Sequence, residues 1–115
     1  METNTLKFSS LKRKEFREVL KRGKSLKEGF LVLKWQKNKE KKIRLGVLMS
    51  TKFSKKAVLR NKTKRRIREI VRANLKNFPQ GFDLIFIPLK GLKTDFESLK
   101  KKIEKLFKKA KILKR

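Results

Sequence analysis

The segment Phe82–Ile87 limits the fold of this chain more than any other part of its sequence. It is almost continuously apolar, and Pro88 and Gly91 follow it as residues that end regular structure. A strand with apolar residues at successive positions is expected to be covered on both of its faces. Because the chain has 115 residues, we expect one domain over 1–115, with a single modest core.

Helical and strand periodicities predict the remaining elements. Helices are expected over 11–22 and 58–76, and a third helix is expected to open at the T-x-x-E capping box that begins at Thr94. Strands over 29–36 and 43–50, separated by a polar turn, are expected to pair as an antiparallel hairpin. The predicted order is therefore α-β-β-α-β-α, an α+β fold with helices packed against one small sheet.

Other segments carry weaker patterns. A short extra strand near 25–27 is weakly indicated, residues 1–9 are expected to be flexible, and 110–115 is expected to be a basic tail. The predicted core face of the third helix consists of Phe96, Leu99, Ile103, Leu106, Phe107 and Ala110.

Positive charge dominates the composition. Lys and Arg number 37 against 10 Asp and Glu, which gives a formal net charge of +27. Self-repulsion of this size opposes a compact fold, so an anionic partner is expected: nucleic acid, an anionic membrane or a highly acidic protein. Because 37% of the residues are hydrophobic and stand in periodic blocks, the chain is expected to fold rather than to act as a disordered basic tail.

Cys and His are both missing from the sequence. Without Cys there is no disulfide framework, Cys-based zinc site or thiol nucleophile, and without His the commonest general base and metal ligand is lacking. No apolar run approaches the roughly 20 residues that span a bilayer, and residues 1–10 lack a signal-peptide core. We therefore expect a cytoplasmic protein.

One side of the second predicted helix carries a column of long polar side chains. At about 100° per residue, the column falls within an arc of roughly 60°, and its members are Asn61, Arg65, Arg68 and Arg72. The apolar residues of the same segment occupy a different sector. Like charges at i, i+3 and i+4 destabilise a helix slightly, and a bound polyanion would turn that cost into affinity. RNA is the polyanion that we expect.

The order of elements and the residues of the second helix together resemble the protein subunit family of bacterial ribonuclease P. The family signature Arg-Asn-Arg, followed by Lys-Arg and a further Arg, is matched by Arg60-Asn61-Lys62, Lys64-Arg65 and Arg68. Other pieces match in the same order: Leu11 to Phe16, Gly23-Lys24-Ser25, Arg44 to Ser50, Lys52, Ala57 and Gly81 to Ile85. The resemblance covers about Phe8 to Lys109. Lys62 departs from the signature, since it keeps the charge but lacks the planar fork of arginine.

The resemblance implies a topology and two RNA contacts. It implies a left-handed crossover from the second strand of the hairpin through the second helix to the last strand, an exception to the usual hand. It also implies binding of the ribonuclease P catalytic RNA and of the single-stranded 5′ leader of precursor tRNA. The residues implied for the catalytic RNA lie on the second helix and its preceding loop: Lys52, Lys56, Arg60, Asn61, Lys62, Lys64, Arg65, Arg68 and Arg72. Those implied for the leader line a cleft between the first helix and the sheet: Phe16, Leu20, Val32 and Lys34.

The polypeptide is not expected to cut RNA itself. Asp83 belongs to the buried strand, Asp95 is expected to interact with the dipole of the third helix, and glutamates such as Glu15 stand singly among Lys and Arg. No pair of carboxylates has the spacing to hold two cations, so no catalytic or metal-binding side chain is predicted. Mg²⁺ is expected through the RNA partner, and neither a membrane nor a small-molecule substrate is expected.

Several alternatives stay open from the sequence. Asn61 either contacts RNA or bonds backbone groups of a cap or loop, and Trp35 is either a core residue or an RNA platform. Phe16 either packs against the sheet or leaves its ring open in the cleft. The alternative function is a small basic ribosomal or RNA-assembly protein without a processing role. A membrane-active basic helix over 96–113 is a third class, and its need for a core partner argues against it.

Overall fold

The apolar segment Phe82–Pro88 forms strand β5, which lies at the centre of a five-stranded sheet in a computed structural model that describes residues 6–114. The strand order is β1-β4-β5-β3-β2, with β5 parallel to β4 and antiparallel to β3. The other strands are β1 Lys7–Ser10, β2 Lys24–Glu28, β3 Leu31–Lys37 and β4 Lys42–Val47.

The predicted hairpin between 29–36 and 43–50 is wrong, because β5 lies between β3 and β4 and pairs with both. A strand that is apolar on both faces is best placed at the centre of a sheet, where helices can cover each face. The polar turn after β3 crosses the end of β5, and the Asn38 N–H donates to the Gly81 carbonyl oxygen there at 3.2 Å. Direct pairing of β3 with β4 would have displaced β5 from this position.

The N-terminal segment adopts a strand where the sequence predicted flexibility over 1–9. Leu6 is buried, and β1 pairs in parallel with β4. Phe8 packs against the core, which gives this strand an apolar anchor. Residues 1–5 lie outside the described residues. The weakly indicated strand near 25–27 is confirmed as β2, which pairs with β3.

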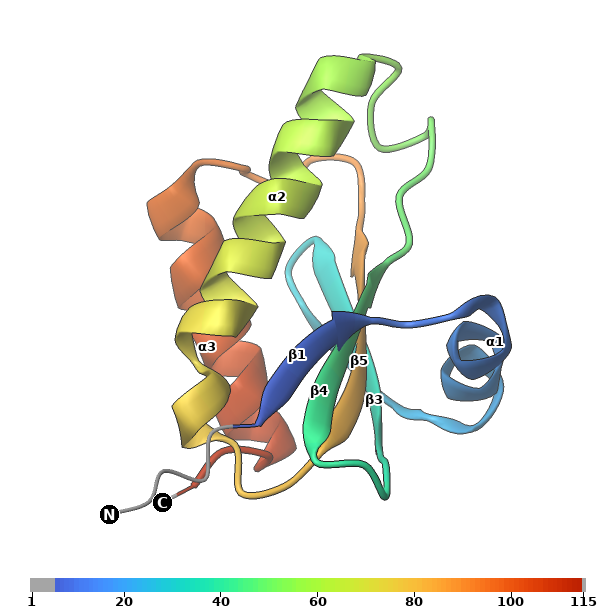
Figure 1. The fold of residues 1–115 in the computed structure, drawn as a ribbon. Coiled ribbons are helices and arrows are strands. Elements are labelled where there is room, and N and C mark those ends of the chain that lie inside the picture. The colour runs from blue at the N-terminus through green and yellow to red at the C-terminus, as the bar shows by residue number, and fades with distance from the viewer. Residues whose placement is uncertain (1–5, 115) are drawn as a thin grey trace.

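Three helices cover the sheet, with α1 on one face and α2 beside α3 on the other (Figure 1). Their bounds are α1 Arg13–Arg22, α2 Ala57–Ala73 and α3 Phe96–Ala110, and a short 3₁₀ helix, Leu75–Asn77, follows α2. This arrangement confirms the predicted α+β fold, with β1 and β2 added to the predicted elements. Strands β4 and β5 are parallel neighbours joined through α2, which is the crossover that the resemblance implies. The left-handed sense of this crossover rests on the resemblance alone.

Two helices begin later than predicted. α1 starts two residues further on, because the chain through Ser10 belongs to β1. α3 is capped by Asp95 instead of Thr94, since the Asp95 carboxylate accepts a hydrogen bond from the Ser98 N–H at 3.0 Å. The side chain of Ser98 and then its backbone N–H lower the pKa of Asp95. Phe96, predicted to be in the core, follows the cap and is 40% exposed.

The main core lies between the sheet and the layer formed by α2 and α3. The predicted core face of α3 is confirmed at its four buried positions, Leu99, Ile103, Leu106 and Phe107. The predicted basic tail folds back over this core, because Lys111 takes a left-handed φ of 57° and Ile112 is buried beyond it. The Lys114 N–H then donates to the Asn77 carbonyl oxygen at 2.6 Å. No helix within residues 6–114 has both the length and the apolar character needed to cross a membrane.

Candidate RNA interface

The polar column predicted on α2 lies on the exposed side of that helix, and we call it the basic row. Its members are all exposed: Asn61, Arg65, Arg68 and Arg72. Lys62 and Lys64 are exposed on either side of the row. The opposite side of α2 is buried through Thr63, Ile67, Ile70 and Val71. The division between a packed side and a charged side is therefore as the periodicity predicted.

The C-terminal half of the basic row borders strand β1. Nη1 of Arg68 lies 3.4 Å from Oγ of Ser10, and the Arg72 guanidinium lies 5.1 Å from the centre of the Phe8 ring. Because both partners belong to β1, this half of the row lies at the sheet edge that β1 forms. Arg66 points elsewhere, since its Nη1 donates to the Thr94 carbonyl oxygen at 2.6 Å in the segment before α3.

The loop before α2 brings further cations to the N-terminal end of this helix. Phe53 is buried in the core and anchors the loop, while Lys52 and Lys56 are exposed. Nη1 of Arg60 donates to the Ser54 carbonyl oxygen at 2.8 Å, which ties the first turn of α2 to the loop. Arg60 is consequently half-buried and less free to meet a partner than the basic row.

A second candidate surface lies where α1 crosses the other face of the sheet. Alternate residues of β3 point into the main core, so Val32 and Lys34 point to the α1 side. Lys34 stands opposite Ile85 of β5, which stands opposite Gly46 of β4. These residues form one row across the sheet beneath α1.

The aromatic ring of Phe16 covers the Gly46 end of that row. A Cβ atom built on Gly46 would lie 2.5 Å from Cε2 of Phe16, so the ring rests where a side chain would otherwise stand. Val19 is fully buried, and Phe16 and Leu20 are half-buried. The structure therefore brings Phe16, on α1, to the same face of the sheet as Val32 and Lys34, and Leu20 lies one turn further along α1.

An ion cluster that the sequence did not predict fastens α1 to the sheet. Nε and Nη2 of Arg44 donate to the two Asp83 carboxylate oxygens at 2.7 and 2.9 Å, and Nη1 donates to Glu15 at 2.6 Å. Nδ2 of Asn38 adds a bond to Asp83 at 2.8 Å. The hydrogen bonds to Asp83 raise the pKa of Arg44. A charged residue inside an apolar strand needs an opposite partner, and knowledge of the strand order would have paired these two residues.

The structure settles the geometry of three residues that the sequence left open. Asn61 lies a full turn inside α2 and is exposed, so it does not cap the helix. Trp35 is 7% exposed and belongs to the core, which leaves it no open face for RNA. The Phe16 ring is half-buried and packs on the sheet at Gly46, and its opening toward a leader cleft stays a prediction.

The acidic side chains with identified partners are engaged by cations or backbone groups. Asp83 and Glu15 bind Arg44, Glu28 binds two lysines of α3, and Asp95 caps that helix. In the part of the chain that the structure describes, no three carboxylates gather in a group that could hold a metal ion.

Comparisons with known proteins show which family the chain resembles. The sequence model of the family described as Ribonuclease P matches residues 7–111. The chain is 44% identical over 85 residues to the ribonuclease P protein component of Thermotoga maritima, covering 74% of this chain and 72% of that protein. It is also 44% identical over 101 residues to the component from Clostridium botulinum, covering 86% of this chain and 90% of the relative.

The fold is similar to that of a solved relative as well. The Staphylococcus aureus RNase P protein superimposes with a TM-score of 0.81 at 30% identity, covering 90% of this chain and 95% of the other. The family match extends over both candidate surfaces, from β1 through α3. The chain therefore belongs to the ribonuclease P protein component family.

Proposed function

We propose that this protein binds the catalytic RNA of ribonuclease P through the basic row and its neighbouring loop, and thereby assists 5′ maturation of tRNA. Membership of the family gives the chain an RNA partner in a ribonucleoprotein. The observation that carries the proposal is the exposure of the basic row on one side of α2, bordered by β1. Arginine forks and an amide at successive helical turns suit the spaced phosphates of folded RNA, and such contacts position the partner without reading its sequence.

The cleft between α1 and the sheet is proposed to hold the 5′ leader of precursor tRNA. Its surface combines the half-buried ring of Phe16 and the side chains of Leu20 and Val32 with the ammonium group of Lys34. An unpaired base can stack on the ring while a phosphate meets the ammonium group, a combination that binds single-stranded RNA with little sequence preference. The Arg44 cluster supports this role, because it holds α1 at a fixed height above the strands.

Catalysis is proposed to belong to the RNA partner and its Mg²⁺ ions. The support from this chain is chemical: it has no His or Cys, and its acidic groups with identified partners are engaged by Arg, Lys or a helix terminus. The basic surfaces then assist by screening phosphate repulsion where RNA, substrate and Mg²⁺ meet. We place this complex in the cytoplasm, where bacterial tRNA precursors are made.

Reconstitution with a bacterial ribonuclease P RNA tests the proposal directly. We expect the protein to restore leader cleavage at low Mg²⁺ concentration, and we expect the double variant Arg65→Ala with Arg68→Ala to bind the RNA at least about tenfold more weakly. Both residues are exposed, so the circular-dichroism spectrum should stay unchanged.

The matched control is Lys100→Ala with Lys108→Ala, which removes the same charge from exposed positions of α3. If RNA affinity depends on the basic row, this control should change it by less than about threefold, a loss from general charge alone. Equal losses in both double variants would contradict a specific role for the row. Leader cleavage that does not respond to the protein would contradict the proposed function itself.

A further inference from the structure

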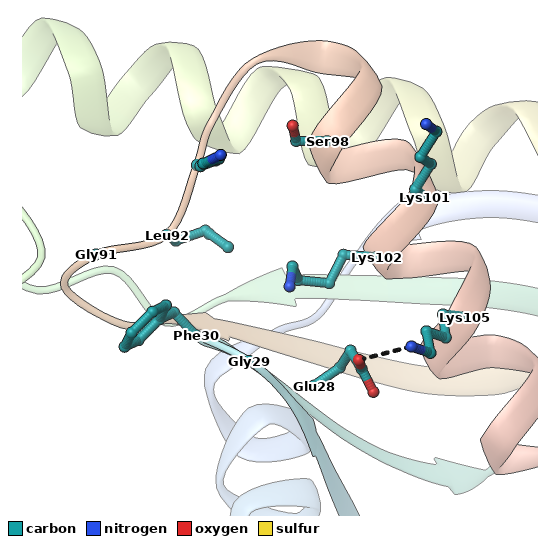
Figure 2. A pocket seen from close by; sticks show the side chains of 10 residues that line it. Glu28, Gly29, Phe30, Gly91, Leu92, Ser98, Lys101, Lys102 and Lys105 are labelled. Carbon is teal, nitrogen blue, oxygen red and sulfur yellow. Dashed lines mark ion pairs between the residues drawn. The ribbon is translucent and has the colours of Figure 1, made fainter.

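A pocket of about 510 Å³ lies on the α3 side of the sheet, on the face opposite to α1 (Figures 1 and 2). The turn between β2 and β3, the loop between β5 and α3, and one side of α3 form its walls. The lining combines an aromatic ring with several ammonium groups: Phe30, Lys93, Lys101, Lys102 and Lys105. It contains none of the residues assigned above to the catalytic RNA or the leader.

One face of the Phe30 ring packs against backbone, and the other face is exposed. A Cβ atom on Gly91 would lie 3.4, 3.4 and 3.5 Å from three adjacent ring atoms, and such equal distances mean that the ring turns its face to the Gly91 backbone. Gly91 has a φ of 103°, which side-chain-bearing residues rarely adopt, so this backing depends on glycine. Phe30 is nevertheless 51% exposed, and its second face is therefore available to a partner.

Lys102 brings a positive charge to Gly29, the residue before Phe30. It reaches from α3 across the pocket toward the β2–β3 turn (Figure 2), and its Nζ atom would lie 2.6 Å from a Cβ atom on Gly29. The missing side chain of Gly29 thus makes room for the ammonium group. Within residues 6–114, no hydrogen bond or ion pair engages the ammonium groups of Lys93, Lys101 or Lys102.

The one acidic residue of the pocket does not oppose an anion. The Glu28 carboxylate lies 3.1 Å from Nζ of Lys105 and 2.6 Å from Nζ of Lys109. These bonds lower the pKa of Glu28, so the carboxylate stays charged and stays paired. Two lysines neutralise Glu28, and three others keep their charge for a ligand.

We propose that this pocket binds one unpaired nucleotide of an RNA, with the base on the open face of Phe30 and a phosphate on Lys102. Lys93 and Lys101 would meet the neighbouring phosphates. A flat apolar face beside ammonium groups provides the two contacts that a nucleotide needs, stacking and charge neutralisation. An acidic peptide would use the lysines but leave the ring without a flat partner. The site lies beyond the proposed function, since neither the basic row nor the leader cleft contributes to it.

Nuclear magnetic resonance on the full chain can test this site separately from every other cationic surface. Titration with adenosine 5′-monophosphate should shift the backbone signals of Gly29, Phe30 and Gly91, and ribose 5-phosphate should shift them much less. The two probes carry the same phosphate, so the difference reports the base. A short oligoadenylate should saturate the same signals at least about tenfold more tightly, because adjacent phosphates reach further lysines.

Two substitutions locate the binding energy. Phe30→Leu keeps an apolar side chain but removes the ring, and it should weaken adenosine 5′-monophosphate binding by about fivefold or more. Phe96→Leu is the matched control, since Phe96 is a similarly exposed phenylalanine outside the pocket, and it should leave the titration unchanged. Lys102→Gln should weaken both nucleotide probes, whereas Lys108→Gln should not.

Three results would overturn the proposal. Equal shifts by adenosine 5′-monophosphate and ribose 5-phosphate would show diffuse attraction of anions only. Equal affinity for the mononucleotide and the oligoadenylate would indicate a free nucleotide as the ligand and not RNA. A dimer in sedimentation velocity that Phe30→Leu dissociates would show that a second copy of the chain occupies the pocket. Each readout is independent of leader cleavage, so a failure here is distinguishable from failure of the proposed function.

Discussion

Arg44 connects three elements through one guanidinium group, because it binds Glu15 of α1 and Asp83 of β5 from its own position on β4. We predict that Arg44→Ala lowers the free energy of unfolding by about 3 kcal/mol, since Asp83 is then left as a buried charge without its main partner. Urea denaturation at neutral pH measures this loss.

The control for this prediction is the ion pair between Arg22 and Glu18, in which Nε of Arg22 lies 3.7 Å from Oε1 of Glu18. Their side chains are 70% and 46% exposed. Arg22→Ala should change stability by less than about 0.5 kcal/mol, because solvent screens such pairs. If both alanine variants lost the same small amount, the Arg44 cluster would be no more than a surface contact.

Asp95 gives the stability of α3 a dependence on acid. Its pKa is lowered from the ordinary value of 3.8 by hydrogen bonds from the side chain and the backbone N–H of Ser98. The stabilisation is therefore fully present above that value and is lost as the pH falls through the lower pKa of the folded state. Asp95→Asn keeps an oxygen acceptor that does not titrate, so its melting temperature should fall less than that of the original chain as the pH drops below 3.8. If the melting temperatures of Asp95→Asn and of the original chain fell by the same amount in acid, this prediction would be wrong.

The sequence predicted the exposure or burial of single residues correctly where these depend on the period of one helix. The exposure of Arg65 and the burial of Ile67 both follow from the helical period, whatever α2 packs against. The contact between Arg44 and Asp83 could not be predicted, because it depends on the register of two strands that are far apart in the chain. The pocket at Phe30 could not be predicted either, because its walls come from the β2–β3 turn and the β5–α3 loop, which are also far apart in the chain.

The position of helix α1 depends on the absence of a side chain at Gly46. We predict that Gly46→Ala destabilises the fold by about 1–3 kcal/mol, because the new Cβ atom would lie 2.5 Å from the Phe16 ring and force it to move. Chemical denaturation measures the loss, and leader binding should weaken in parallel because the ring borders the cleft.

A double variant separates this contact from a general effect of glycine replacement. In a Phe16→Leu background the smaller side chain should relieve the clash, so Gly46→Ala should cost at least about 0.5 kcal/mol less than it does alone. Additive losses would mean that α1 does not depend on this contact.

The elements themselves were largely predictable, and their arrangement was not. The apolar run of β5 indicated a strand covered on both faces, which α1 on one face of the sheet and α2 with α3 on the other provide (Figure 1). The polar turn between β3 and β4 favoured a hairpin, since local pattern contains no information about a strand that arrives later in the chain. β1 was missed because a strand of four residues carries too little alternation to be recognised.

Net charge links the stability of the whole molecule to its binding. At +27, added salt should screen self-repulsion and raise the melting temperature of the free protein. The same salt should weaken RNA binding by on the order of 10³-fold between about 50 and 200 mM if about six cations meet phosphates. Differential scanning fluorimetry and filter binding measure the two trends. An RNA affinity that is indifferent to salt would contradict an electrostatic interface.

The central place of β5 also governs when this protein can mature during synthesis. β3 and β4 leave the ribosome first, yet each keeps an unsatisfied inner edge until residues 82–88 emerge and slide between them. Without β5, the remaining strand pairs, β1 with β4 and β2 with β3, would share no hydrogen-bonded neighbour. We therefore expect a chain that lacks residues 82–88 to expose unpaired strand edges, which are open to aggregation and to proteases.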